Sequence, residues 1–235
     1  TWRYSTILAN VWPPCMIAAL SAALMIWMVP PMLLPRINPF PLSHKQRRDI
    51  YVRQSKVEGY RARSVYKLIE INEKFKIFKG GLSVIDIGAA PGSWSQYASR
   101  IVKSGKIISG DLKDMKKING TIQIKGDFTD KDIQNQIKSQ LSNGSDIVMS
   151  DMAVNTTGIK NVDSIQTGEL CKEAMMFSKE VISKKGFFIS KIFMGGTFNE
   201  IVALGKKIFK EVKVFKPKSS RKDSKESFII CKILR

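Results

Sequence analysis

The residues with the clearest chemical potential follow short apolar runs that are typical of buried strands. The run 83–87 ends in a loop that contains Gly92 and Trp94. Glycines in such a loop let the backbone approach a ligand closely at the carboxyl end of a strand, where doubly wound α/β folds bind nucleotides. Two carboxylates, Asp111 and Asp127, follow the next two apolar runs. This order predicts a binding site for a nucleotide or nucleoside.

The loop lacks the pattern of a dinucleotide-binding loop. G-x-G-x-x-G is absent, and Pro91 stands where a pyrophosphate group would need a free backbone N–H. Asp111 lies roughly 20 residues after the loop, the usual distance for a carboxylate that accepts both ribose hydroxyls, and Asp127 would reach an adenine amine. A nucleoside without phosphates indicates S-adenosyl-L-methionine. The expected cofactor-binding residues of this region are Gly92, Trp94, Asp111 and Asp127.

The composition indicates a negatively charged partner. The 235-residue chain has 39 Lys and Arg against 20 Asp and Glu, a formal charge of +19. Such an excess attracts polyanions, nucleic acid first and anionic membrane second. With 43% hydrophobic residues, the chain is long enough for one well-packed domain and an appended segment.

The cysteines and the histidine argue against a metal site. Cys15, Cys171 and Cys231 are too few and too widely spaced for a disulfide framework or a CxxC metal site. This pattern fits a reducing, cytoplasmic location. His44 is the only histidine, so a Ser-His-Asp triad within the sheet-forming part is excluded. Acid–base chemistry must come from carboxylates, lysines or tyrosines.

Residues 1–43 differ in composition from the rest of the chain. The segment 7–34 has no charged residue and is interrupted by two proline pairs. Its uninterrupted apolar stretch, 15–29, is short for a transmembrane helix, which needs about 20 residues, and a signal-peptide core or an interfacial segment would also fit. We interpret residues 1–43 as an extension without stable membrane association, and residues 44–235 as the functional domain.

The remainder alternates apolar runs with amphipathic helical patterns. A basic stretch, 44–63, precedes a helical stripe over 64–75. Short β-branched runs predict seven strands, at 82–87, 106–109, 121–125, 146–149, 186–192, 211–215 and 227–234. Helical patterns lie between most of them, at 94–102, 130–141, 168–183 and 197–209. This rhythm predicts an α/β fold with an open, mostly parallel sheet and helices on both faces.

Two charged residues fall at the ends of predicted strands. Asp151 follows the run 146–149, and Lys191 lies near the end of the run 186–192. The carboxyl ends of parallel strands meet at the ligand-binding edge of a sheet. Both side chains are therefore candidates for the chemistry.

Five segments carry a resemblance to a known family. In family order they resemble the motifs of FtsJ/RrmJ-type ribosomal RNA methyltransferases, over about residues 48–235. The segments are 59–68, 86–94, 150–155, 190–193 and 216–221. The resemblance implies a Rossmann-like class I methyltransferase with a seven-stranded, mostly parallel sheet and an antiparallel last strand. It also implies transfer of a methyl group from S-adenosyl-L-methionine to a ribose 2′-hydroxyl of RNA.

The resemblance further implies a catalytic tetrad, which matches Lys67, Asp151, Lys191 and Glu226. A ribose hydroxyl is a poor nucleophile, so transfer needs a base and in-line alignment with the donor methyl. Lys191 is the candidate base, because burial and the positive charge of Lys67 would favour a neutral amine. Asp151 would orient Lys191 and, as a further expected cofactor-binding residue, the donor methyl. Glu226 would hold the hydroxyl or Lys67, and Lys67 would stabilise oxyanion charge.

Other methyl acceptors fit less well. Asp151 is not followed by the Pro-Pro-aromatic motif that is typical of amino-group methyltransferases. Methylation at carbon-5 of a pyrimidine needs a nucleophilic cysteine, whereas Cys171 and Cys231 fall within a helical and a strand pattern. An oxidoreductase is disfavoured by the missing dinucleotide pattern. Val154, Ser93 and Met194 depart from the family pattern, which affects the shape of loops and none of the tetrad.

The resemblance implies a monomeric enzyme whose partner is ribosomal RNA within the large ribosomal subunit. The implied acceptor is a uridine in the A loop of 23S rRNA, while transfer RNA or another RNA, and a non-catalytic ribosome-assembly factor, stay open as alternatives. The basic stretch 44–63 and a second basic cluster, 216–225, flank the expected site. Both would hold RNA phosphates, unless they form only a solvated basic face.

Overall fold

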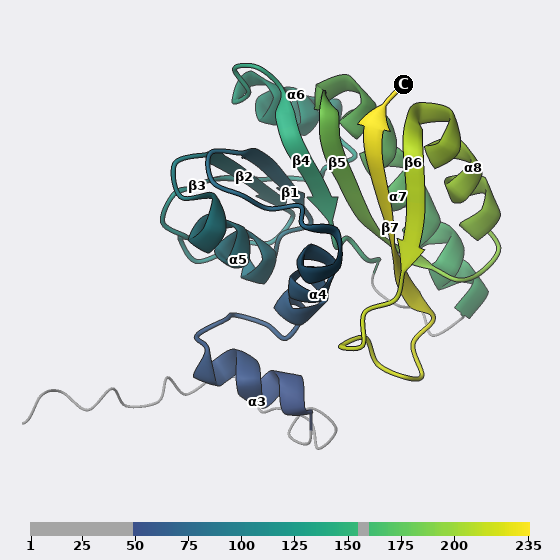
Figure 1. Ribbon diagram of the computed structural model, residues 1–235, viewed down its shortest axis with the longest axis horizontal. Coiled ribbons are helices and arrows are strands. Elements are labelled where there is room, and N and C mark those ends of the chain that lie inside the picture. The colour runs from purple at the N-terminus through teal and green to yellow at the C-terminus, as the bar shows by residue number, and fades with distance from the viewer. Residues whose placement is uncertain (1–48, 155–159) are drawn as a thin grey trace, which may run out of the picture. The chain divides into compact units, whose positions relative to one another are not determined.

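The computed structural model describes residues 49–154 and 160–235 (Figure 1). The predicted extension, 1–43, and the start of the basic stretch, 44–48, lie outside the described residues. Among the described residues, no helix combines the length and the apolar character needed to cross a membrane.

The centre of the fold is a seven-stranded sheet. Its strands are β1 (Ser83–Ile87), β2 (Lys106–Asp111), β3 (Thr121–Lys125), β4 (Ser145–Ser150), β5 (Ile182–Phe193), β6 (Phe209–Phe215) and β7 (Glu226–Leu234). They lie in the order β3-β2-β1-β4-β5-β7-β6. Neighbouring strands are parallel from β3 to β5, and β7 runs antiparallel to both β5 and β6. The predicted α/β class, the mostly parallel sheet and the antiparallel last strand are confirmed.

Helices cover both faces of this sheet (Figure 1). The helices of the described residues are α3 (Ile50–Val57), α4 (Val65–Phe75), α5 (Ser93–Val102), α6 (Lys131–Ser139), α7 (Lys160–Val181) and α8 (Phe198–Ile208), of which α3 lies beyond the edge of the sheet (Figure 1). Apolar residues of α4 and α5 form one core layer with the sheet. Apolar residues of α6, α7 and α8 form the second core layer on the opposite face.

The burial of the strands explains their sequence patterns. In β7, residues 228–231 are at most 3% exposed, because helices cover both faces of this inner strand. An inner strand therefore reads as a continuous apolar run. The edge strand β6 instead exposes Lys210, Glu211 and Lys213, and charged side chains on an edge discourage pairing with another chain.

Two helices differ from the prediction. The sequence does not predict α3, because its apolar residues Ile50 and Val57 are 75% and 88% exposed and mark no buried stripe. Its start is fixed instead by the side chain of Asp49, which accepts a hydrogen bond from Tyr51 N at 3.1 Å. Helix α7 begins at Lys160 rather than at 168. The pattern missed its first turns because their apolar side chains, Val162 and Ile165, are exposed and mark no buried stripe.

The topology brings several loop and strand ends to one edge of the sheet. The parallel strands β1 to β5 all end there. Because β7 is antiparallel to β5, it begins at the same edge, with Glu226 opposite Phe193 and Phe228 opposite Lys191. Residues that are far apart in the sequence therefore meet at this edge.

Candidate active site

Four charged side chains form two ion pairs at this edge of the sheet. Lys67 of α4 pairs with Glu226, the first residue of β7. Lys191 of β5 pairs with Asp151, which directly follows β4. These are the four residues of the predicted tetrad, and the fold brings them together.

Lys67 and Glu226 are held firmly in place. Lys67 Nζ donates to Glu226 Oε2 at 2.8 Å, and the two side chains are only 14% and 12% exposed. Ser220 Oγ donates to the other carboxylate oxygen, Oε1, at 2.8 Å. Both oxygens of Glu226 thus have a partner, and this fixes the position of Lys67 Nζ.

Lys191 and Asp151 form a more buried pair. Lys191 Nζ donates to the backbone O of Asp151 at 2.8 Å and lies 3.0 Å from its Oδ1. The Lys191 side chain is 7% exposed. Burial alone would raise the pKa of Asp151, but the positive charges of Lys191 and Lys67 outweigh it and hold this pKa below its ordinary value. The two lysines thus favour the ionised form of Asp151.

A cavity of about 470 Å³ opens beside Asp151. Most of its lining comes from the end of β2 and the segments that follow β1, β2, β3 and β4, and Leu170 of α7 completes it. We call it the carboxylate cavity, because three of its lining residues are Asp111, Asp127 and Asp151. All three were predicted from the sequence as cofactor-binding residues.

Backbone and side-chain hydrogen bonds orient two of these carboxylates. Asp111 accepts from Ala90 N and from Lys113 N, each at 2.8 Å. Asp127 Oδ1 accepts from Thr129 N at 2.9 Å and from Thr129 Oγ1 at 2.8 Å, and these bonds lower the pKa of Asp127. Each carboxylate oxygen has two lone pairs. Both groups therefore retain the capacity to accept from hydroxyl or amine groups of a ligand.

Gly92 and Trp94 do not line the carboxylate cavity. The indole of Trp94 is 2% exposed and packs against Phe228, with ring centroids 5.7 Å apart. Its Nε1 donates to Ser64 O at 2.9 Å, which joins the start of α5 to the start of α4. Trp94 lies outside the lining because its side chain belongs to the core. Gly92 stands at the amino end of α5 with φ of 101°.

Gly88, directly after β1, is required for the close approach of two loops. Its φ is +73°, and a Cβ there would lie 2.5 Å from Met152 Cγ and 3.0 Å from Met152 Cα. We expect Gly88→Ala to reduce the free energy of unfolding by about 2–4 kcal/mol, through backbone strain and overpacking. The measurement is urea-induced unfolding.

Gly120 provides the matched control. It also has a positive φ, +77°, but a Cβ there would meet nothing within 4 Å. Gly120→Ala should therefore cost only the backbone strain, about 1–2 kcal/mol. Equal losses for the two variants would contradict a steric role for Met152.

A second cavity, of about 370 Å³, lies beside Lys67 and Glu226. We call it the arginine cavity, because Arg63 and Arg221 contribute to its lining. Asp223 and Ser224 complete the lining. One ion pair thus faces the arginine cavity, while Asp151 of the other pair faces the carboxylate cavity.

Two arginines of the predicted phosphate-binding stretch have partners inside the protein. Arg63 donates to the carboxylate of Asp49 and to the backbone O of Ser219. Arg61 donates to three backbone carbonyls of loops. Arg61 therefore makes three hydrogen bonds within the fold, and the expectation that this stretch holds RNA phosphates stays a prediction.

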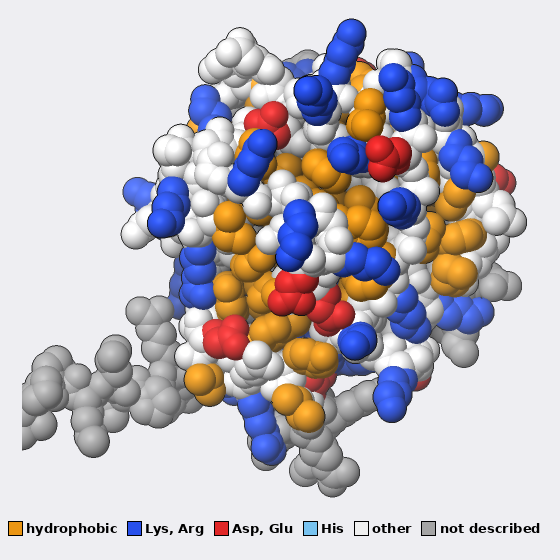
Figure 2. Space-filling view, in the orientation of Figure 1, with side chains coloured by type: hydrophobic (Ala, Val, Ile, Leu, Met, Phe, Trp, Pro, Cys, Tyr) orange, Lys and Arg blue, Asp and Glu red, His pale blue; other side chains and the backbone are white. Residues whose placement is uncertain are grey.

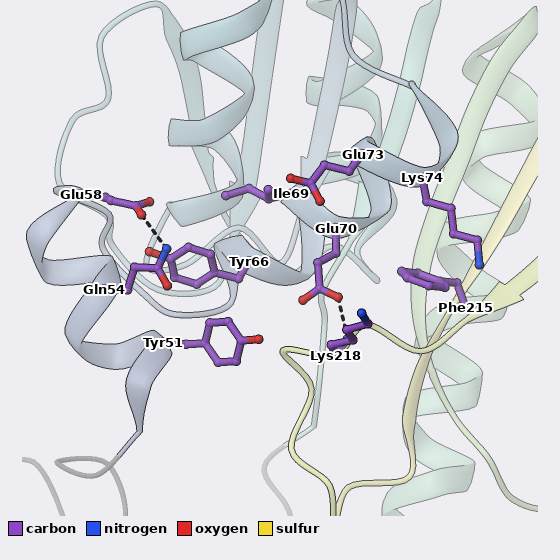
Figure 3. Close-up of a pocket in the computed structure, with 10 residues that line it drawn as sticks. All are labelled: Tyr51, Gln54, Glu58, Tyr66, Ile69, Glu70, Glu73, Lys74, Phe215 and Lys218. Atoms are coloured by element: carbon purple, nitrogen blue, oxygen red, sulfur yellow. Dashed lines mark hydrogen bonds between the residues drawn. The ribbon is translucent and has the colours of Figure 1, made fainter.

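A third cavity, of about 730 Å³, lies between α3, α4 and the segment around residues 215–218 (Figure 3). Figure 2 shows acidic side chains gathered near the centre of this face, with Lys and Arg around them. One carboxylate that lines this third cavity, Glu70, accepts hydrogen bonds from Lys218 N at 2.6 Å and from Ser219 N at 2.8 Å. Glu70 thereby anchors the loop that brings Ser220 to Glu226. The sequence did not reveal Glu70, because its partners are backbone groups 148 and 149 residues away.

The sheet order, the antiparallel β7 and the charged edge define a Rossmann-like methyltransferase. The chain belongs to the FtsJ-like methyltransferase family, whose model matches residues 60–234. The predicted family is confirmed.

Individual relatives agree with this assignment. The chain is 72% identical over 192 residues to the ribosomal RNA large subunit methyltransferase E of Pelagibacter ubique, a match that covers 82% of this chain and 95% of the relative. The protein of the same name from Rickettsia bellii is 46% identical, with 79% and 85% covered. A crystal structure described as a ribosomal RNA methyltransferase of Plasmodium falciparum matches with a TM-score of 0.67 and 31% identity, covering 74% of this chain and 98% of that chain.

Proposed function

We propose that this methyltransferase transfers the methyl group of S-adenosyl-L-methionine to a ribose 2′-hydroxyl of RNA. The observation that carries the proposal is the position of the two ion pairs. Lys67 and Glu226 line the arginine cavity, and Asp151 of the other pair lines the carboxylate cavity. The carboxylate cavity would hold the cofactor, and the arginine cavity would hold the acceptor nucleotide. A reaction between the two ligands would then occur next to Lys67, Asp151, Lys191 and Glu226.

The carboxylates of the carboxylate cavity suit the hydroxyl and amine groups of a nucleoside. Asp111 ends β2, at the place of the carboxylate that accepts ribose hydroxyls in related folds, and Asp127 follows β3, where it would reach an adenine amine. Asp151 also lines this cavity, and its buried Oδ1 lies 3.0 Å from Lys191 Nζ; its negative charge would also attract a positively charged group of the ligand. Gly92 and Trp94 would act by shaping the loop. When bound, S-adenosyl-L-methionine supplies an electrophilic methyl group on a sulfonium.

The four charged residues have distinct proposed roles. Lys191 Nζ removes the proton of the 2′-hydroxyl, for which the amine must be neutral. Asp151 orients this amine through its Oδ1, 3.0 Å away, and its backbone O, 2.8 Å away. Glu226 holds Lys67 at 2.8 Å, and Lys67 stabilises the negative charge that develops on the acceptor oxygen.

The proposed acceptor is a uridine in the A loop of 23S rRNA within the large ribosomal subunit. The names of the relatives from Pelagibacter and Rickettsia support a large-subunit ribosomal RNA, and the charge of +19 suits an RNA partner. We further propose a monomeric, cytoplasmic enzyme. Its catalytic domain comprises residues 44–235, and residues 1–43 form an extension that takes no part in catalysis.

The direct test is methyl transfer to ribosomal subunits. Subunits that lack the modification are incubated with the protein and S-adenosyl-L-methionine carrying a labelled methyl group, and the modified nucleotide is mapped. We expect one labelled 2′-O-methyluridine in the large subunit. If only transfer RNA were labelled, the acceptor would be a transfer RNA and not the ribosomal RNA. Binding to subunits without any transfer would indicate an assembly factor and overturn the proposal.

Asp111→Ala should weaken cofactor binding. A carboxylate can accept from both ribose hydroxyls at once, so its loss should cost about 1.5–3 kcal/mol of binding free energy. Calorimetry with S-adenosylhomocysteine measures this loss. Asp114→Ala is the control, because Asp114 is 80% exposed, pairs only with Lys125 among the described residues and does not line the cavity. Unchanged affinity for Asp111→Ala would refute the ribose assignment.

A further inference from the structure

We propose that Arg61 is a positioning residue for the cofactor site and not a ligand of RNA phosphates. The inference rests on the proposed function, because it treats the carboxylate cavity as the cofactor site. Arg61 lies between α3 and α4 in the basic stretch, where its sequence context resembles that of its neighbour Arg63. Its contacts are different.

The guanidinium of Arg61 ties together two loops. Nη1 donates to Pro91 O at 3.0 Å and to Lys116 O at 2.7 Å, and Nη2 donates to Lys117 O at 2.9 Å. Pro91 belongs to the loop after β1, and the two lysines belong to the segment after β2. One side chain therefore connects two segments that come from neighbouring strands.

Both of these segments form walls of the carboxylate cavity. The loop after β1 contributes Gly88 and Ala90 to the lining, and the segment after β2 contributes Leu112 and Lys113. The two walls also meet at Asp111, whose carboxylate accepts from Ala90 N at 2.8 Å. The Arg61 bridge lies on the same two segments as this contact, so its loss should let Asp111 and the loop move apart.

The backbone around Arg61 is held by Gln96 of α5. Arg61 N donates to Gln96 Oε1 at 3.2 Å, and Gln96 Nε2 donates to Gly59 O at 2.7 Å. The guanidinium also packs against Gly92, where a Cβ would come within 2.9 Å of Arg61 Nη1. The glycine that the sequence singled out thus makes room for the guanidinium.

The chemistry of the bridge requires an arginine. A guanidinium presents five donors in a planar fork and reaches several carbonyls at once, whereas a lysine offers one compact ammonium. A phosphate that recruited Arg61 would leave backbone carbonyls without their donor, which costs free energy. Three of the five donors of Arg61 therefore hold loops, and the proposal assigns the RNA phosphates to other basic residues.

The experiment measures binding of S-adenosylhomocysteine by calorimetry to the full-length protein, to Arg61→Lys and to Arg100→Lys. Arg100 is the matched control: its Nη2 donates to Glu58 O at 3.1 Å and its guanidinium lies 4.0 Å from the centroid of the Tyr60 ring, so it fixes the same connecting segment. It does not line the carboxylate cavity. We expect Arg61→Lys to raise the Kd about tenfold, and Arg100→Lys to leave it unchanged.

Two further measurements distinguish a specific effect of Arg61 on the cofactor site from a general loss of order in the protein. Free guanidinium at millimolar concentration should lower the Kd of Arg61→Ala towards the wild-type value. In steady-state methylation, Arg61→Lys should raise KM for the cofactor about tenfold, while KM for ribosomal subunits stays near the wild-type value.

Several outcomes would overturn the inference. These are wild-type cofactor affinity in Arg61→Lys, an equal loss in Arg100→Lys, or a loss confined to affinity for ribosomal subunits. Failure of the wild-type protein to bind S-adenosylhomocysteine would be a different result, because it would overturn the proposed cofactor and this inference together.

Discussion

Replacing Lys191 with arginine should reduce methyl transfer as severely as replacing it with alanine, by about 10²–10⁴-fold. Arginine keeps the positive charge and much of the length, so it can still pair with Asp151. It does not act as a base, because a guanidinium stays protonated in proteins. The measurement is single-turnover methylation of ribosomal subunits at saturating cofactor.

The comparison of the two Lys191 variants separates two roles. If Lys191 served only to stabilise negative charge, the arginine variant should retain substantial activity while the alanine variant loses it. Binding of S-adenosylhomocysteine should remain measurable in both, which establishes that the protein is folded. A near-normal rate for Lys191→Arg would eliminate the assignment of Lys191 as the base.

Replacing Asp151 with asparagine should also reduce turnover strongly, by about 10²-fold or more, which corresponds to about 3 kcal/mol. The substitution keeps the shape of the side chain but removes its charge. Lys191, 3.0 Å away, would lose the carboxylate that orients it, while Lys67 would keep its pair with Glu226. Single-turnover rates at saturating cofactor again provide the measurement.

Asp127→Asn is the control for this prediction. Asp127 lines the same cavity, but the only contacts of its side chain among the described residues are with Thr129. The variant should therefore bind S-adenosylhomocysteine more weakly and yet turn over at a near wild-type rate once the cofactor is saturating. If Asp151→Asn behaved in the same way, Asp151 would contribute to binding alone.

The sequence by itself determined the order and type of most elements. Strands that are buried on both faces, such as β7, must be continuous apolar runs, and the helices between them carry an apolar stripe at helical spacing. These patterns depend on local periodicity, which a sequence displays directly. The motif segments likewise predicted the family, and the family model matches residues 60–234.

Local periodicity could not reveal helices without an apolar stripe, or the direction in which a single side chain points. Helix α3 exposes its apolar residues Ile50 and Val57, so it carries no stripe to recognise. The indole of Trp94, next to a glycine loop, gives no sign that it turns into the core rather than towards a ligand. In both cases the packing of other elements decides the outcome.

Only the tertiary structure decided which charges act within the site and which hold it together. Lys67 meets Glu226 across 159 residues because β7 enters the sheet antiparallel, at the edge where the parallel strands end. Arg61 and Glu70 bind backbone groups of distant loops. A side-chain bond to a backbone carbonyl or amide requires no particular residue type at the partner position. Such a bond therefore produces no recognisable spacing or composition. From the sequence alone, an arginine that holds a loop cannot be distinguished from one that binds a phosphate.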